Sequence, residues 1–136
     1  MNDPEPSDWR YVGFEVVQAI HERQIDEHGG ADGIRDLGVI ESALARPINL
    51  ASCADPDAAG LSAAYAFGFA QDHGFVDGSK RTGWVAARLF LADNDYRIEF
   101  ELADAIRTMA AVAADSMGEA DLAAWFRVRV HPVAVR

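Results

Sequence analysis

Cysteine and lysine are nearly absent from this chain of 136 residues, since each occurs once, as Cys53 and Lys80. One cysteine cannot form an internal disulfide bond, and it excludes zinc and iron–sulfur sites that need several cysteines. This usage is typical of the reducing cytosol, so we expect a cytoplasmic protein. Long hydrophobic runs are also missing: the apolar stretches 63–70 and 84–92 are too short to span a bilayer, and Arg88 interrupts the second.

Positive charge is scarce as well. The chain has 22 acidic and 12 basic side chains, which gives a net charge of −10. Binding to nucleic acid or to an anionic membrane relies on the opposite sign, so neither is expected as a main partner. The first eight residues contain neither a basic n-region nor an apolar segment, so no secretory signal is predicted there. The length and the 50% hydrophobic content are those of one ordinary globular domain.

Apolar residues recur at helical spacing through most of the chain. Phe14, Val17 and Ile20 share one face of the first helical segment, and Gly29 ends it because glycine adopts the left-handed conformation of helix C-termini. The pattern predicts six helices, over residues 14–28, 37–44, 58–72, 79–92, 101–114 and 116–128. We therefore expect an all-α fold, a compact single-domain bundle with its core at about residues 12–130 and with residues 1–10 and 131–136 as flexible tails.

Several boundaries rest on individual residues. Pro47 is expected to end the second helix, since the residue before a proline is pushed out of the helical region. Residues 49–57 then form the least regular segment, which favours an exposed loop or a short hairpin. Ser116 and Glu119 match a capping box at the start of the last helix. Residues 96–100 alternate weakly, as a short extended strand would.

One segment carries candidate chemistry: it runs His73-Gly74-Phe75-Val76-Asp77-Gly78-Ser79-Lys80-Arg81-Thr82, between the third and fourth helices. Gly78 permits a tight turn, and Ser79 is expected to be the N-cap. The N–H groups of a first helical turn lack helical partners and lie at the positive end of the helix dipole, so this end is a candidate anion site. Phe75 is expected to hold the loop to the core.

The charged side chains of this segment suit a phosphate ligand. Lys80 and Arg81 lie in the first turn of the helix, where cations are electrostatically unfavourable unless an anion binds against them. Asp77 offers carboxylate oxygens, which together with phosphate oxygens suit Mg²⁺. His73 is the candidate general base for a hydroxyl nucleophile, because histidine is the side chain that most often accepts a proton in catalysis. Taken singly, each of these residues is more often structural or solvated, and it is their grouping that favours a site.

Two other known motifs are each excluded by a single residue. The segment is not a Walker A loop, because Ser79 separates Gly78 from Lys80. The run His21-Glu22-Arg23-Gln24-Ile25 has isoleucine where a zinc protease has its second histidine. His21 and His28 are therefore expected to be surface or cap residues.

The candidate segment resembles the signature of the Fic/Doc family, in which His-x-Phe-x-Asp/Glu-Gly/Ala-Asn-Gly/Lys-Arg joins two helices of an all-α fold. Two further stretches resemble the N-terminal half of death-on-curing (Doc) toxins: they are His28-Gly29-Gly30-x-x-Gly33-Ile34-Arg35-Asp36 and Glu41-Ser42-Ala43-Leu44-Ala45-Arg46-Pro47. The likeness covers about residues 16–128. The short chain is more similar to Doc toxins than to the larger Fic enzymes.

The resemblance implies a role for each residue of the motif. His73 would deprotonate a target hydroxyl, and Asp77 would hold Mg²⁺ on the phosphates of ATP. Gly78, Ser79, Lys80 and Arg81 would bind the phosphates, with Lys80 and Arg81 supplying charge for catalysis. AMP-transferring Fic proteins usually have glycine at the position of Lys80. Lysine there is typical of Doc members, which transfer the γ-phosphate of ATP to a threonine of translation elongation factor Tu.

Three functions stay open at this point. The first is a Mg²⁺- and ATP-dependent protein kinase toxin, which Lys80 favours. The second is an AMP transferase on the same fold, which Asp77 and Gly78 permit equally. The third is a catalytically degenerate binding module, because Ser79 replaces the family's asparagine and its hydroxyl is too short to donate and accept across the same gap.

The resemblance also bears on regulation. The chain has no Ser/Thr-x-x-x-Glu-Gly/Asn pattern, the inhibitory helix of many Fic proteins, which implies inhibition by a separate antitoxin protein. Residues 49–57 are the candidate flap that aligns a target peptide. Many Fic proteins place a second arginine after the motif, where this chain has Gly83 and Trp84. Arg88 is two turns from Arg81 and is the remaining candidate for the same side of the helix.

Overall fold

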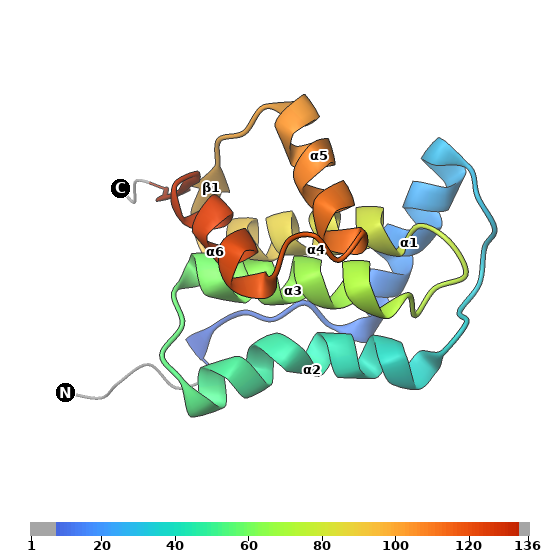
Figure 1. Cartoon of the computed structure of the whole chain (residues 1–136). Helices are drawn as coiled ribbons and strands as arrows, with labels where there is room; N and C mark the ends of the chain where they lie inside the picture. Colours follow the sequence, from blue (N-terminus) through green and yellow to red (C-terminus); the bar gives the residue numbers. More distant parts are fainter. Residues whose placement is uncertain (1–7, 134–136) are drawn as a thin grey trace.

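The computed structural model describes residues 8–133 of the chain. Within that range it has six helices and one small sheet (Figure 1). The helices are α1 (Phe14–His28), α2 (Leu37–Cys53), α3 (Ala58–Asp72), α4 (Ser79–Asp93), α5 (Leu102–Ala113) and α6 (Glu119–Arg127), and the strands are β1 (Tyr96–Ile98) and β2 (Val130–Pro132). This confirms the all-α bundle of six helices predicted from the sequence. None of the helices between residues 8 and 133 has the length and apolar character needed to cross a membrane.

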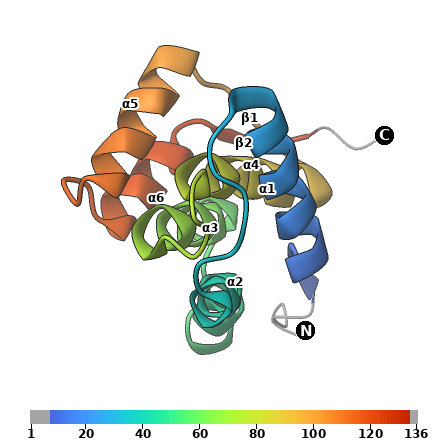
Figure 2. The same ribbon diagram turned by 90° about the vertical axis from the view of Figure 1, so that its right-hand side faces the viewer.

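Helix α3 lies at the centre of the bundle. It packs against α2 on one side and against α4 and α6 on the other (Figures 1 and 2). Eleven of its 15 residues are buried, as expected for a helix that is apolar all round. Because neighbouring helices hold α3 on several sides, its C-terminal end, where the candidate segment begins, has a defined position.

The residues before α1 are tied to this central helix by Tyr65. Its hydroxyl oxygen accepts a 2.8 Å hydrogen bond from the backbone N–H of Val12. Both residues are buried, and burial raises the pKa of the Tyr65 phenol far above its usual range. The ring packs on Phe90 of α4 with 5.3 Å between centroids. One side chain thus joins the chain before α1, α3 and α4.

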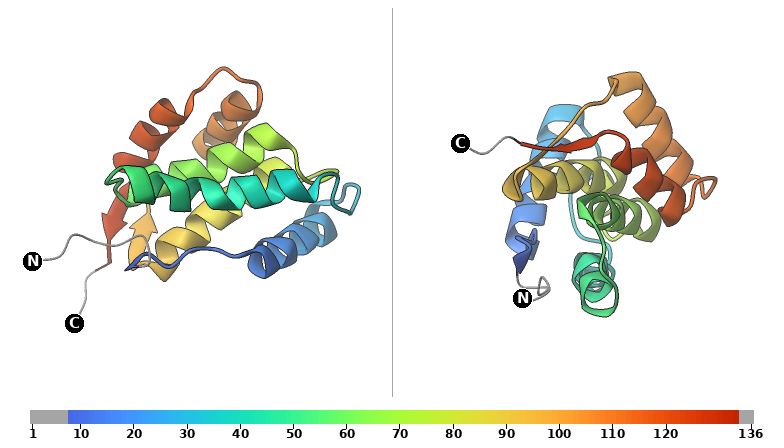
Figure 3. Two further views of the ribbon diagram at one scale, coloured as in Figure 1. Left: turned by 90° about the horizontal axis from the view of Figure 1, so that it is seen from below. Right: turned by 90° about the vertical axis from the view of Figure 1, so that its left-hand side faces the viewer.

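The two strands form a small antiparallel sheet. They lie at the end of α4 remote from residues 73–78, and the left view of Figure 3 shows them side by side. The short extended segment predicted after the fourth helix is confirmed by β1. Residues 131–132, which the sequence places in a terminal tail, belong to β2. The predicted tail residues 1–7 and 134–136 lie outside the described range.

The prediction that Pro47 ends the second helix is wrong, because α2 continues to Cys53. Ile40, Ala43 and Pro47 are the buried residues of α2, and this stripe packs against α3. A proline inside a helix costs about 3 kcal/mol, so burial of the stripe outweighs the lost hydrogen bond. The irregular segment predicted after this helix therefore shrinks to residues 54–57.

The predicted capping box at the start of the last helix is also wrong. Gly118 is the N-cap of α6, and no side chain hydrogen-bonds to this end. The hydroxyl of Ser116 instead donates to the carbonyl oxygen of Ala111, at 3.0 Å, and Glu119 forms an ion pair with Arg46 of α2. Both side chains of the expected box thus have other partners.

Tyr65→Phe should lower the free energy of unfolding by about 1–3 kcal/mol, because it leaves the N–H of Val12 buried without an acceptor. Tyr11→Phe is the matched control, since the Tyr11 hydroxyl is buried without a hydrogen-bond partner in the described part of the chain. Urea denaturation of both variants measures the difference. Equal destabilisation by the two substitutions would contradict the role given to Tyr65.

Candidate active site

The motif loop, residues 73–78, joins α3 to α4 and is anchored by Phe75. The Phe75 ring is buried and stacks on His21 of α1, with 3.8 Å between centroids. It also stacks on Phe69 of α3, with centroids 6.4 Å apart. The expectation that Phe75 holds the loop to the core is confirmed.

Residues 33–36 lie beside the motif loop. Ile34 and Phe75 form an isolated antiparallel bridge, in which the N–H of Arg35 donates to the carbonyl oxygen of Gly74 at 2.9 Å. Figure 2 shows this segment, in cyan, passing the end of α3. The segment expected to be the flap, residues 49–57, is helical as far as Cys53, and residues 54–57 lie at the opposite end of α3 from the motif loop (Figure 1).

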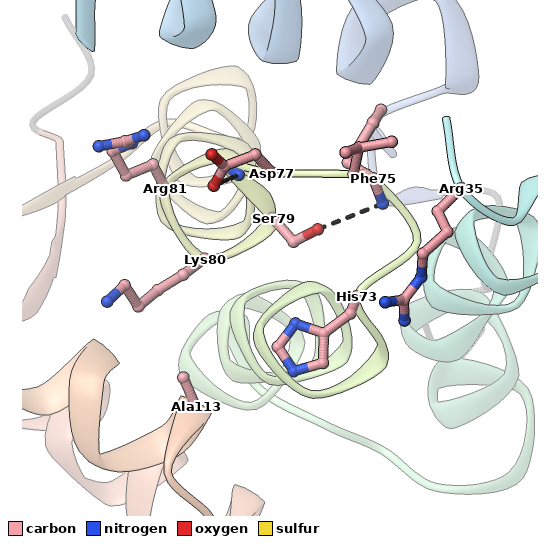
Figure 4. A pocket seen from close by; sticks show the side chains of 10 residues that line it. Arg35, His73, Phe75, Asp77, Ser79, Lys80, Arg81 and Ala113 are labelled. Carbon is pink, nitrogen blue, oxygen red and sulfur yellow. Dashed lines mark hydrogen bonds between the residues drawn. The ribbon is translucent and has the colours of Figure 1, made fainter. Parts of the chain in front are cut away.

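Helix α4 begins directly at the motif loop, and its N-cap is Gly78 rather than the predicted Ser79. Gly78 has a left-handed conformation, with φ at 78°, which glycine adopts without strain. No side chain caps the helix, so the N–H groups of its first turn are open to an external anion. Ser79 is only 5% exposed, and its Oγ accepts the N–H of Phe75 at 3.3 Å (Figure 4). Its hydroxyl closes the loop onto the helix start.

A pocket of about 330 Å³ opens at this end of α4. It is lined by Arg35, His73, Phe75, Val76, Asp77, Gly78, Ser79, Lys80, Arg81 and Ala113. Figure 4 shows the side chains of Arg35 and Lys80 on either side of His73. The pocket therefore combines residues of the motif loop and α4 with one residue from the segment before α2 and one from α5.

The cationic side chains of this pocket are not engaged in ion pairs with other residues of the described range. Six arginines elsewhere pair with carboxylates, but within residues 8–133 Arg35, Lys80 and Arg81 form no ion pair. The Nε of Arg81 is buried without a hydrogen-bond partner in the same range. A buried donor without a partner costs free energy unless a ligand satisfies it, so this arrangement suits an anion with several oxygens.

Among residues 8–133, Asp77 is the one carboxylate that lines the pocket. Its Oδ1 accepts the N–H of Gly78 at 2.8 Å, and its Oδ2 lies against the backbone of Gly30. A Cβ at position 30 would lie 2.6 Å from Oδ2, so glycine there leaves room for the carboxylate. Within residues 8–133 no group of three or more His, Cys, Asp or Glu side chains is placed to hold a metal ion. Asp77 alone fits Mg²⁺ that is bound mainly by phosphate oxygens and water.

His73 forms the C-cap of α3 in a left-handed conformation, with φ at 52° and ψ at 45°. This conformation costs an ordinary residue about 1–2 kcal/mol, because Cβ crowds the following carbonyl oxygen. Strain of this kind concentrates at functional sites. The exposed imidazole lines the pocket, where a reacting hydroxyl can approach it.

Comparison with protein-family models matches residues 11–91 to the Fic/DOC family. The chain belongs to this family. Toxin Doc of Mycolicibacterium smegmatis is 38% identical over 72 residues, which are 52% of this chain and 55% of that toxin. Protein kinase doc of Escherichia phage P1 is 34% identical over 98 residues, which are 70% of this chain and 78% of that protein. The chain thus spans about half the length of the first relative.

Two residues in or beside this Fic/DOC pocket could not be assigned to it from their local sequence. His21, expected at the surface or at a cap, is buried, and its Nε2 lies 2.6 Å from the carbonyl oxygen of Asp77. Its position four residues after the buried Val17, on the same face of α1, is the signal that could have found it. Arg35 is far from the motif in sequence and enters the pocket only through the bridge between residues 33–36 and the motif loop.

Arg88, the candidate for a second arginine after the motif, does not line the pocket. The guanidinium of Arg88 lies over the rings of Trp84 and Phe100, at 5.9 and 5.2 Å from their centroids. These distances are typical of cation–π contacts. Its position therefore indicates a structural role on the exposed side of α4.

His73→Gly should be more stable than His73→Ala by about 1 kcal/mol, because alanine keeps a Cβ in the left-handed conformation and glycine does not. The free energy of unfolding of both variants, from urea denaturation, tests this. The same two substitutions at Glu22, an exposed position inside α1, should give the opposite order, since glycine is the poorer helix former. Equal stabilities of the two variants at position 73 would show that a Cβ there costs no strain.

Proposed function

We propose that this Fic/DOC chain is a Doc-type toxin that transfers the γ-phosphate of ATP to a hydroxyl group of a protein. The observation that carries the proposal is the uncapped start of α4, where Lys80 and Arg81 have no carboxylate partner in the described part of the chain. Unpaired cations beside open backbone N–H groups suit a polyphosphate. The similarity to a phage protein named protein kinase doc supports the reaction type.

His73 is the proposed general base. In the reaction, the acceptor oxygen bonds to the γ-phosphorus, the bond between that phosphorus and the bridging oxygen breaks, and ADP leaves. The proton of the acceptor hydroxyl goes to the imidazole of His73. Lys80, Arg81 and the N–H groups of the first turn of α4 stabilise the negative charge of the transferred group.

Asp77 is the proposed ligand of Mg²⁺. Since a single carboxylate of the described residues lines the pocket, we expect Mg²⁺ to bind together with the nucleotide rather than before it. Magnesium, when bound, neutralises charge on the phosphates. The contact of Gly30 with the Asp77 carboxylate and the hydrogen bond from Gly78 limit the directions in which this ligand can point.

The proposed acceptor is a threonine of elongation factor Tu, the target that the resemblance implies, and its modification would block translation. The proposed inhibitor is a separate antitoxin protein. Two observations support a separate inhibitor: the chain has no inhibitory Ser/Thr-x-x-x-Glu-Gly/Asn pattern, and a relative is named toxin Doc. With a net charge of −10, the proposal includes no nucleic-acid or membrane partner.

A transfer assay with two labels tests the proposal. Purified protein, Mg²⁺, elongation factor Tu and ATP labelled at either the α or the γ phosphate should give label on the acceptor from the γ position only. His73→Ala should lower the rate by about 10²–10⁴-fold, the usual effect of removing a general base. Omission of Mg²⁺ should also abolish transfer.

The other outcomes of this assay separate the alternatives. Label from the α position would show AMP transfer, and the role given to Lys80 would then be wrong. Absence of both labels, with ATP still bound in calorimetry, would favour another acceptor protein. Absence of both transfer and ATP binding would contradict the proposed function and favour a binding module.

Ser79→Asn tests whether serine weakens the site. We expect the transfer rate to change by less than about tenfold, an effect of 1.4 kcal/mol, because a carboxamide oxygen also accepts the N–H of Phe75. Ser79→Ala is the matched variant: it leaves that buried N–H without an acceptor and should cost about 1–3 kcal/mol of unfolding free energy. A rate gain far above tenfold in the asparagine variant would identify the natural chain as a degenerate member.

A further inference from the structure

We propose that His21 is a positioning residue that sets the direction of the Asp77 carboxylate. For its catalytic consequence this inference rests on the proposed function. The first observation is burial: His21 is 2% exposed, although the next residue of α1, Glu22, is at the surface. Burying a polar ring costs free energy unless its nitrogen atoms find partners, so the partners of the ring indicate why it lies inside.

The His21 ring contacts two alternate residues of the motif loop. Its Nε2 lies 2.6 Å from the carbonyl oxygen of Asp77, and because a carbonyl only accepts, Nε2 must carry the proton and donate it. One face of the ring stacks on Phe75, with the two planes 9° from parallel. The other nitrogen, Nδ1, lies 4.0 Å from Oδ1 of the exposed Asp32, too far for a hydrogen bond.

A single rigid unit connects His21 to the Asp77 side chain. The carbonyl of Asp77 and the N–H of Gly78 are the two ends of one planar peptide group. His21 holds the carbonyl end, and the N–H end donates to Oδ1 of Asp77 at 2.8 Å. Fixing the carbonyl therefore fixes the direction of the N–H, and with it the carboxylate that the N–H holds.

Gly78 lies close to the same ring. A Cβ at this position would be 3.6 Å from Nε2 of His21. Since Gly78 is also the N-cap of α4, the ring contacts the point where the carboxylate and the phosphate-facing helix end meet. His21 itself does not line the pocket, so its effect on the reaction passes through the backbone of the motif loop.

Two variants separate the hydrogen bond from the stacking. His21→Phe keeps a flat ring on Phe75 and loses the donor, whereas His21→Gln keeps an Nε2 donor and loses the ring. His21→Phe should weaken Mg²⁺-dependent ATP binding and lower kcat/KM by about 10–100-fold, the usual range for partners that orient a metal ligand. His21→Gln should recover most of this loss, and His131→Phe, at a partly exposed histidine of β2, should change neither quantity.

Calorimetry, transfer kinetics and thermal melting of the three variants measure these effects. Equal losses in His21→Phe and His21→Gln would assign the residue to packing and overturn the inference. So would full activity of a folded His21→Phe variant.

Nuclear magnetic resonance keeps this test distinct from that of the proposed function. In the natural protein, the imidazole proton should reside on Nε2 of His21 and be protected from solvent exchange. His21→Phe should shift the amide resonance of Gly78, and His21→Gln should restore it. If these signals appear while the protein neither binds ATP nor transfers phosphate, the proposed function fails and the positioning role holds. A ring without a proton on Nε2, or an unmoved Gly78 resonance, would overturn the inference.

Discussion

The stacking of Phe75 between α1 and α3 is the contact on which the candidate site depends. The motif loop is short and bears polar residues at both ends, so an apolar anchor at its centre is what gives those ends fixed places. Burying a phenylalanine side chain contributes about 1.5–3 kcal/mol. This is enough to offset the about 1–2 kcal/mol that the left-handed conformation of His73 costs. The strained histidine and the Asp77 turn thus stay in place because the residue between them is buried.

Around this anchor, each neighbouring element fixes a different part of the loop. Residues 33–36 pair with its backbone from one side, the hydroxyl of Ser79 closes it from the helix side, and His21 holds the carbonyl of Asp77. The central position of α3 fixes the start of the loop. Helix α4 follows the loop, and its first turn carries Lys80 and Arg81. The pocket is therefore a product of the bundle as a whole, although most of its residues are consecutive in the chain.

Because most residues of the pocket are consecutive in the chain, much of the site could be predicted from the sequence. The six helices follow from apolar periodicity, and the contiguous motif between His73 and Arg81 could be recognised because one loop and one helical turn contain it. The predictions that were wrong are those in which a rule based on neighbouring residues conflicts with packing in the folded protein. Pro47 lies inside α2 because its ring is buried against α3. Gly78 rather than Ser79 is the N-cap of α4, and the hydroxyl of Ser79 instead accepts the N–H of Phe75. His21 and Arg35 reach the loop from distant segments, and only the three-dimensional fold shows those contacts.

The placement of charge has a consequence for how ligands arrive. The chain carries a net charge of −10, so at long range the molecule repels anions. Yet Arg35, Lys80 and Arg81 gather at one concave site and form no ion pair in the described range. Counter-ions of the solvent screen the overall repulsion within about 8–10 Å at physiological ionic strength. An approaching anion therefore meets attraction near the pocket and not at long range. The net negative charge disfavours nonspecific binding of anions, and the three cations of the pocket favour binding of a negatively charged ligand there.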